Sequence, residues 1–305
     1  MRLFWQNRYL RLAPTYWVVF AVALVHTLLR KRAGELLTTL PTMNAGSIAL
    51  VVLVNVAIVG QDLTNFLGFT PEAGEHGFHF VSQFWGGSTR PGWHFLLIPP
   101  AWTIALELMF YLFVPLLARR RTKTLVALAA ASLALRFAIY AQGLRYDPWT
   151  YRFFPNELVF FLAGMLAYRL YRSYSWDRLP RWAKTAVYVL FLAFPLTAGN
   201  QQVSTAYAIA LPLLLPPVFA MSRRWKWDGR LAELSYPLYI SHWLFVQGAQ
   251  RAGKWGPMVA GSLAVGAAVL LVRLVERPVD RFRQRRLEQA QALDLVAAER
   301  RAVSG

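Results

Sequence analysis

Apolar runs of roughly bilayer-crossing length recur along this 305-residue chain and constrain its fold more than any other feature. A transmembrane helix needs about 20 consecutive, mostly apolar residues. The runs that approach or meet this length are 14–29, 46–60, 100–118, 124–142, 156–170, 184–199, 203–221, 233–250 and 256–275. The pattern predicts an all-α, polytopic transmembrane helix bundle with about nine spans.

The composition excludes a soluble globular protein. Hydrophobic residues make up 56% of the chain and charged residues only 16%. Soluble domains are about 45–50% apolar and about 25% charged, and a single water-facing domain of this size cannot bury so much apolar surface. The chain also has no cysteine, which excludes disulfides, thiolate metal sites and cysteine nucleophiles.

The positive charge is distributed unevenly between the segments that separate the runs. The chain has 33 Lys and Arg residues and a net charge of +18. When the segments are assigned alternately to two sides, one side carries 24 basic residues and the other, which includes residues 1–13, carries 8. The basic side comprises 30–45, 119–123, 169–184, 222–232 and the tail from 273. By the positive-inside rule this side is cytoplasmic, so we predict a multi-pass inner-membrane protein with a cytoplasmic C-terminal tail and no nucleic-acid partner.

Two segments lie outside the pattern of apolar runs. Residues 277–305 are polar, basic and helix-prone, which predicts a cytoplasmic tail that also contacts anionic membrane lipids; residues 1–276 form the transmembrane domain. The segment 61–99 is a long loop, and such loops are uncommon unless functional or disordered. Its His76 and His79 are a weak pattern for a metal site, and we expect none.

Glu107 is the only acid well inside an apolar run. A charged side chain at the bilayer centre costs about 2.5–3.5 kcal/mol on insertion scales and therefore usually faces a cavity or a partner. Thr103, Glu107 and Tyr111 are spaced i, i+4 and i+8, so they share one helix face. This face is either functional or a buried acid tied to an arginine. Arg136 is the candidate partner, unless its side chain extends to the membrane surface.

The stretch 234–243 contains a second group of polar residues. Ser235 as N-cap and Pro237 in the first turn predict a helix start. Ser235, Tyr239 and His242 then fall at i, i+4 and i+7 on one face. His242 is either a hydrogen-bonding group between helices or part of a substrate-facing surface that transfers protons.

Arg8 and Arg11 form a basic face just before the first predicted span. They serve either as a topological anchor or as a phosphate-binding pair, for which the guanidinium fork is well suited.

Together these stretches resemble the membrane acyltransferase-3 family. The matching pieces are Arg8-x-x-Arg11 with Pro14-x-Tyr16-Trp17, Trp102-x-x-x-x-Glu107 with Phe110-Tyr111 and Pro115, Phe161-x-x-Gly164-Met165 with Ala167, Ser235-Tyr236-x-x-Tyr239-x-x-His242, and Glu276-Arg277-Pro278. Each piece is weak alone, but their order and their places at the edges of the runs cover nearly the whole chain.

The resemblance implies an integral membrane acyltransferase that moves an acyl group, in the first place an acetyl group, from cytoplasmic acyl-CoA to an acceptor hydroxyl. The implied acceptor is a glycan or a similar molecule, such as a cell-envelope polysaccharide. Acyl-CoA is then a co-substrate, and no bound cofactor is expected. Glu107 and His242 are the candidate catalytic residues, and they act as a pair if they face each other. The candidate substrate-binding residues are Arg8, Arg11, Tyr111, Arg136, Ser235, Tyr236 and Tyr239.

The chain departs from the resemblance at its start. The family opens with two further spans, of which the first carries an arginine followed ten residues later by the catalytic histidine. Here Met1 lies only seven residues before the Arg8 of Arg8-x-x-Arg11, so we expect an N-terminally truncated domain without that histidine. The alternative is a non-enzymatic multi-pass protein, either a lipid or glycan transporter or an inactive homologue.

The predicted topology also conflicts with an acyl-CoA donor. The alternation places Arg8 and Arg11 outside, whereas binding of CoA requires them inside. We expect one false or missed span around residues 30–60 to be the cause.

Overall fold

The structure is a computed structural model that describes residues 1–29, 38–193, 196, 201–223 and 225–303, and it is nearly all-α. The main helices are α1 (Arg2–Leu29), α3 (Ala45–Ala57), α4 (Trp102–Leu117), α5 (Thr122–Ala141), α6 (Phe154–Ser173), α7 (Arg181–Leu192), α8 (Gln201–Ser222), α9 (Lys226–Ala249), α10 (Gly256–Leu271) and α11 (Arg277–Val303). A π-helical turn, Val272–Glu276, joins α10 to α11 without a break in the helix.

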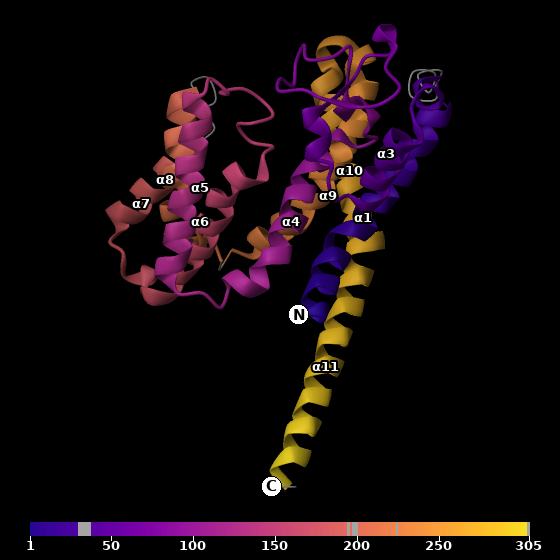
Figure 1. Ribbon diagram of the computed structural model, residues 1–305. Coiled ribbons are helices and arrows are strands. Elements are labelled where there is room, and N and C mark those ends of the chain that lie inside the picture. Colours follow the sequence, from indigo (N-terminus) through magenta and orange to yellow (C-terminus); the bar gives the residue numbers. More distant parts are fainter. Residues whose placement is uncertain (30–37, 194–195, 197–200, 224, 304–305) are drawn as a thin grey trace.

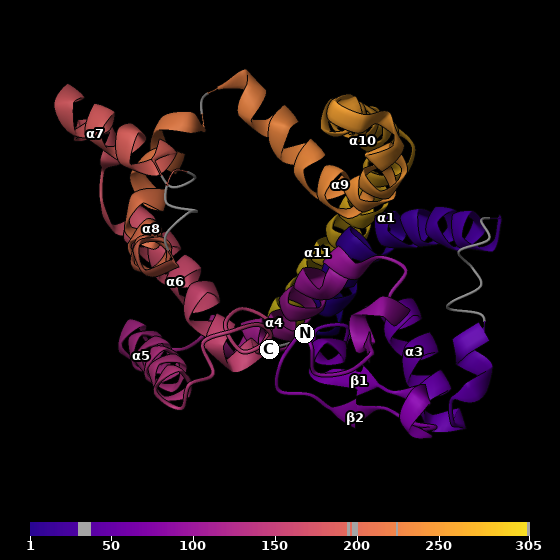
Figure 2. The ribbon, with the colours of Figure 1, turned by 90° about the horizontal axis from the view of Figure 1, so that it is seen from above.

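The helices form two groups (Figures 1 and 2). In one group α5, α6, α7 and α8 pack on one another, and in the other α1 and α10 pack against α9, with α4 beside α1. Contacts between α4 and α6 connect the groups. α11 extends beyond both groups, in line with α10.

The predicted membrane architecture is confirmed, but nine spans are not. Within the described residues, four helices are both long and apolar enough to cross a membrane: Arg2–Leu29, Pro99–Leu117, Thr122–Ala141 and Gly253–Ala292. Two shorter apolar helices are Ala45–Ala57 and Ala210–Ser222. Part of the predicted span 184–199 lies outside the described residues.

The helix α3 corrects the prediction of a span at 46–60. Its 13 residues extend about 20 Å, which is less than the roughly 30 Å hydrocarbon core of a bilayer. Its last turn lies beside the middle of α1, where the Tyr16 hydroxyl donates to the Asn55 carbonyl at 2.6 Å and the Trp17 indole to the Val56 carbonyl at 3.1 Å. The helix therefore stops halfway along α1.

The chain reverses immediately after α3. Ile58 and Gly60 both have positive φ, at 70° and 86°, and a β-branched residue in this conformation is strained. Asp62 is buried in the turn, and burial raises its pKa to about 6. The turn directs the chain back into the long loop, which also contacts the start of α3, where the Asn44 N–H donates to the His76 carbonyl.

The false span explains the topological conflict. Arg286 of α11 donates to the Gln6 side chain of α1 at 2.8 Å, and the Thr15 hydroxyl of α1 donates to Glu276 at 3.3 Å. The N-terminus and the start of α11 therefore lie at the same end of the molecule (Figure 1), which we call the tail end. Arg8 and Arg11 belong to this end, and the alternation assigned them wrongly because it counted α3 as a crossing.

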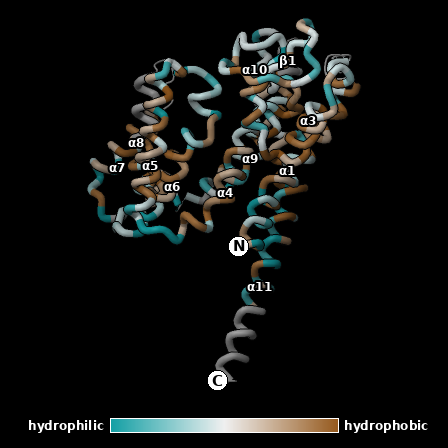
Figure 3. Tube along the Cα trace, viewed as in Figure 1, coloured by the Kyte–Doolittle hydropathy of each residue, from teal (hydrophilic) through white to brown (hydrophobic). Residues whose placement is uncertain are grey.

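Hydrophilic residues also mark the tail end. Figure 3 shows them at the start of α11 and at the connections between α4 and α5 and between α6 and α7, at the lower ends of the two helix groups. The α4–α5 connection contains Arg119, Arg120 and Arg121.

The loop 61–99 is ordered and lies at the opposite end (Figure 1). It forms a small antiparallel sheet in which β1 (Leu67–Phe69) lies between β2 (His79–Phe80) and β3 (Arg90–Pro91). Phe69 and Phe95 of the loop pack with Val51 of α3. Gly92 permits a close approach, since a Cβ there would lie 2.4 Å from the Thr64 carbonyl oxygen.

The main core holds α1, α4 and α9 together. Tyr16 of α1, Ile104 and Leu108 of α4 and Ile240 of α9 are all buried in one cluster. Full burial of such side chains contributes about 1.5–3 kcal/mol each. These contacts set the positions of the polar residues that the sequence analysis selected on the same three helices.

Candidate functional site

The polar face of α4 meets Arg8 of α1. The Tyr111 hydroxyl donates to a Glu107 carboxylate oxygen one turn away. The Arg8 guanidinium carbon lies 5.3 Å from the Tyr111 ring centroid and 5.3 Å from that of Phe4, within range of a cation–π interaction. The structure therefore brings Arg8 of α1 together with Tyr111 and Glu107, near the middle of α4.

The other end of the same face meets α9. The Thr103 hydroxyl donates to the Tyr239 hydroxyl oxygen at 3.0 Å, and the Tyr239 hydroxyl donates to the Pro100 carbonyl at 2.8 Å. His242 is the next polar residue on this side of α9, with its ring centroid 5.8 Å from that of Tyr239.

These residues form a line that we call the polar track. It follows one face of α4 between contacts with α1 and α9, and consecutive polar residues on α4 are about 6 Å apart along the helix. Its members are Arg8, Tyr111, Glu107, Thr103, Tyr239 and His242.

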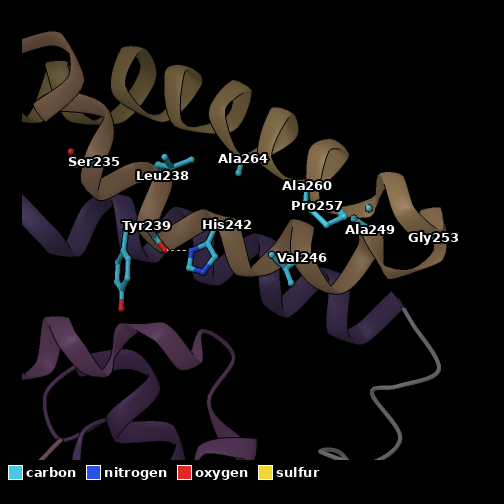
Figure 4. A pocket seen from close by; sticks show the side chains of 12 residues that line it. Ser235, Leu238, Tyr239, His242, Val246, Ala249, Gly253, Pro257, Ala260 and Ala264 are labelled. Carbon is cyan, nitrogen blue, oxygen red and sulfur yellow. Dashed lines mark hydrogen bonds between the residues drawn. The ribbon is translucent and has the colours of Figure 1, made fainter. Parts of the chain in front are cut away.

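His242 borders a cavity of about 750 Å³ between α9 and α10, which we call the α9–α10 cavity (Figure 4). The Tyr239 side chain points away from this cavity, and its hydroxyl donates to the Pro100 carbonyl. The lining residues are Ser235, Leu238, Tyr239, His242, Val246, Ala249, Gly253, Gly256, Pro257, Ala260, Gly261 and Ala264. The prediction that Ser235, Tyr239 and His242 share one helix face is confirmed.

The prediction that Ser235 starts a helix is wrong. α9 begins at Lys226, so Ser235 and Pro237 lie in its interior. The Ser235 hydroxyl donates to the Leu231 carbonyl at 3.1 Å rather than capping a helix end. The helix extends toward the tail end through the polar and basic residues before Ser235. The predicted apolar run, 233–250, does not include most of these residues.

Glu107 and His242 are not brought together. Glu107 accepts from Tyr111 on its own helix, and the His242 imidazole shares a hydrogen bond with the Tyr239 carbonyl on its own helix. Glu107 is absent from the lining of the α9–α10 cavity. The two residues therefore do not form the expected pair in this structure, and their separate catalytic roles stay predictions.

Arg11 borders a second cavity of about 480 Å³ between α1, α9 and α11. Tyr236 closes one side and donates its hydroxyl to the Leu12 carbonyl at 2.6 Å. Glu276 also lines this cavity, where it accepts from Thr15. Arg11 and Arg8 thus occupy neighbouring sites at the tail end, with different surroundings.

Arg136 lies away from the polar track. Its side chain is buried and forms an ion pair with Glu157 of α6 at 2.6 Å, and it also donates to the Asn156 carbonyl at 3.1 Å. The predicted partnership with Glu107 is therefore wrong, as is the alternative of extension to the membrane surface. A role of Arg136 in substrate binding stays a prediction.

Sequence reasoning missed an ion pair near the far end of the track. The Arg152 Nε donates to both carboxylate oxygens of Asp147, at 2.8 and 2.9 Å. The guanidinium carbon lies 4.5 Å from the ring centroids of Phe84 and Trp102. Burial raises the pKa of Asp147, and Arg152 opposes that shift. No sequence signal reveals this cluster, because its aromatic members come from distant segments.

The histidines of the loop have local partners. His79 lies 2.8 Å from Glu75, and His76 shares a hydrogen bond with the Thr42 carbonyl at 3.2 Å. Among the residues that the structure describes, no three acids or histidines are grouped so that they could hold a metal ion.

These features define a mostly helical membrane protein with a polar track between apolar helices. Comparison with known proteins gives its family: the model for the acyltransferase domain of acyltransferase-3 type matches residues 1–275. The chain therefore belongs to the membrane acyltransferase-3 family. An uncharacterized protein of Aquifex aeolicus (strain VF5) is 25% identical over 216 residues, which are 64% of this chain and 93% of that protein. No solved structure matches.

Proposed function

We propose that the protein is an O-acyltransferase of the inner membrane that moves an acyl group from cytoplasmic acyl-CoA to a hydroxyl of a glycan or similar cell-envelope acceptor. The observation that carries this proposal is the contact of Arg8 with the Tyr111–Glu107 pair at the tail end. This contact connects Arg8, whose guanidinium group is of a kind that binds phosphates, to the polar track, which ends at His242.

The donor is expected at the tail end. Arg8 and Arg11 lie three residues apart on α1, at the end that also carries the basic tail. The positive-inside rule favours the cytoplasm for this end, where acyl-CoA is present. The guanidinium fork suits the phosphates of CoA, which acts as a co-substrate and leaves after the transfer.

The reaction requires a base and a group that stabilises negative charge. A base removes the proton of the acceptor hydroxyl, the oxygen attacks the thioester carbonyl carbon, the C–S bond breaks, and the CoA thiolate leaves and takes up a proton. His242 is the candidate base because it borders the α9–α10 cavity. Glu107 is the second candidate, and Ser235, Tyr236 and Tyr239 are candidates for holding the substrates.

Donor kinetics test this assignment. The purified full chain in lipid vesicles is given radiolabelled acetyl-CoA and envelope polysaccharide, and incorporation into polysaccharide is measured. Arg8→Ala and Arg11→Ala should each raise KM for the donor about tenfold, the loss expected for a charged hydrogen bond. The matched control is Arg2→Ala, an exposed arginine on the same helix. An unchanged KM in both variants would contradict the donor site.

A further inference from the structure

We infer that the α9–α10 cavity receives the hydrocarbon chain of the acyl donor, so that the preferred donor carries a chain much longer than acetyl. This inference rests on the proposed function and names the substrate class that the cavity selects.

The size of the cavity is the first reason. Its volume is about 750 Å³, whereas one water molecule occupies about 30 Å³ of liquid and a methyl group is of similar size. Cavities that hold whole organic ligands measure about 300–1,000 Å³. The space beside His242 therefore exceeds what an acetyl group requires.

The chemistry of the lining is the second reason. Its polar side chains, Ser235, Tyr239 and His242, all come before the apolar lining residues Val246 and Ala249 along α9. Beyond His242 the lining is apolar and includes Val246 and Pro257. His242 and Ala249 are seven residues apart, about 10 Å along the helix. The cavity thus suits a molecule with a polar head beside His242 and an apolar chain.

The small residues of α10 account for the open volume. Gly256, Ala260, Gly261 and Ala264 all face the cavity. Close packing requires glycine at position 256, since a Cβ there would lie 2.6 Å from the Ala249 carbonyl oxygen. A Cβ at Gly261 would meet nothing within 4 Å. Neither close packing nor a positive φ requires glycine at position 261, and its absent side chain leaves the cavity open.

The direction of the cavity agrees with entry of the donor from the tail end. α9 runs from that end, so Ser235 comes before His242, and Gly253 lies beyond both (Figures 1 and 4). A CoA head held near Arg8 and Arg11 would leave the thioester near His242. The chain would then continue into the apolar part of the cavity.

Chain-length preference tests the inference. With the purified full chain, kcat/KM is measured for acetyl-, octanoyl- and palmitoyl-CoA. Octanoyl-CoA should exceed acetyl-CoA by at least about tenfold, because each buried methylene adds binding energy. Gly261→Leu should reduce this preference about tenfold. The matched control, Gly266→Leu, also meets open space on α10 but lies outside the lining, and should preserve the preference.

A photo-crosslinking experiment locates the chain directly. An octanoyl-CoA analogue with a diazirine at the end of its chain should label peptides 246–249 and 256–264, and excess octanoyl-CoA should prevent the labelling. Labelling elsewhere, or protection by phospholipid rather than by octanoyl-CoA, would overturn the inference and indicate a membrane lipid in the cavity.

The two proposals fail in different ways. Transfer from acetyl-CoA with no preference for longer chains, and an equal effect of Gly261→Leu on every donor, would contradict the chain-binding cavity alone. No transfer from any acyl-CoA, together with no labelling by the analogue, would contradict the proposed function as well.

Discussion

The Arg8 guanidinium lies over the ring of Tyr111, 5.3 Å from its centroid, and the Tyr111 hydroxyl donates to Glu107. One aromatic side chain thus contacts a cation of α1 through its ring face and a carboxylate of α4 through its hydroxyl. The arrangement links the tail end of the molecule to the polar face inside the helix bundle, and the two contacts can be separated by substitution.

Tyr111→Phe should separate the two contacts. The ring remains beneath Arg8, but the hydrogen bond to Glu107 is lost. We expect kcat to fall about tenfold, because the carboxylate loses its positioning hydrogen bond, whereas KM for the donor changes less than twofold. Tyr111→Leu, which also removes the ring, should raise KM as well. An equal loss in both variants would show that the hydroxyl has no separate role.

The Arg136–Glu157 pair should contribute to stability rather than to the polar track. Removal of one member of a buried ion pair leaves an uncompensated charge, so Glu157→Ala should lower the free energy of unfolding by about 3 kcal/mol. Chemical unfolding in detergent measures the loss. Arg136→Met combined with Glu157→Ala should recover part of it. If the double variant is less stable than Glu157→Ala, the uncompensated charge is not the cause.

Asp62 should make stability depend on pH. Its pKa is about 6 in the folded protein and near the ordinary 3.8 when unfolded, so the folded state holds the proton more tightly. This contribution is fully present below about pH 4 and is lost as pH rises through 6. At pH 7.5 the loss of this contribution lowers the free energy of unfolding by about 3 kcal/mol relative to its value at low pH.

Asp62→Asn should remove this dependence. We expect the variant to unfold at a higher temperature than the wild type at pH 7.5, to keep about half of that advantage at pH 5, and to unfold at a similar temperature below about pH 4, measured by circular dichroism. A constant difference between the two proteins across this range would contradict the raised pKa.

The absence of cysteine allows a direct test of topology. Single cysteines at Arg2 and Glu288 should react with a membrane-impermeant maleimide from the same side, because both positions are exposed at the tail end. A cysteine at Trp85, which is 70% exposed in the loop 61–99, should react from the opposite side. Reaction of Arg2→Cys and Trp85→Cys from one side would contradict the arrangement of α1.

Patterns within one helix could be predicted from the sequence. Ser235, Tyr239 and His242 share a face because helical periodicity relates residues four or seven apart, and the structure has all three on one cavity. The spacing of Thr103, Glu107 and Tyr111 likewise predicted their common face. These relations depend only on helix geometry and not on which helices are neighbours.

Relations between helices could not be predicted in the same way. Periodicity did not indicate that Arg136 faces Glu157 instead of Glu107, because α5 packs on α6 and lies away from the Glu107 face. Hydropathy did not distinguish α3 from a full span, because an apolar helix of 13 residues and a membrane-crossing one have the same composition. Counting α3 as a crossing contributed to the wrong side assigned to Arg8 and Arg11.

Transfer of a radiolabelled acyl group from acyl-CoA to envelope polysaccharide by the purified full chain, compared with His242→Ala, tests the central claim most directly. We expect time-dependent transfer by the wild type and a reduction in kcat of about 100-fold or more in the variant, the range of general acid–base catalysis. No transfer by a folded wild-type protein, or an undiminished rate in His242→Ala, would contradict the account.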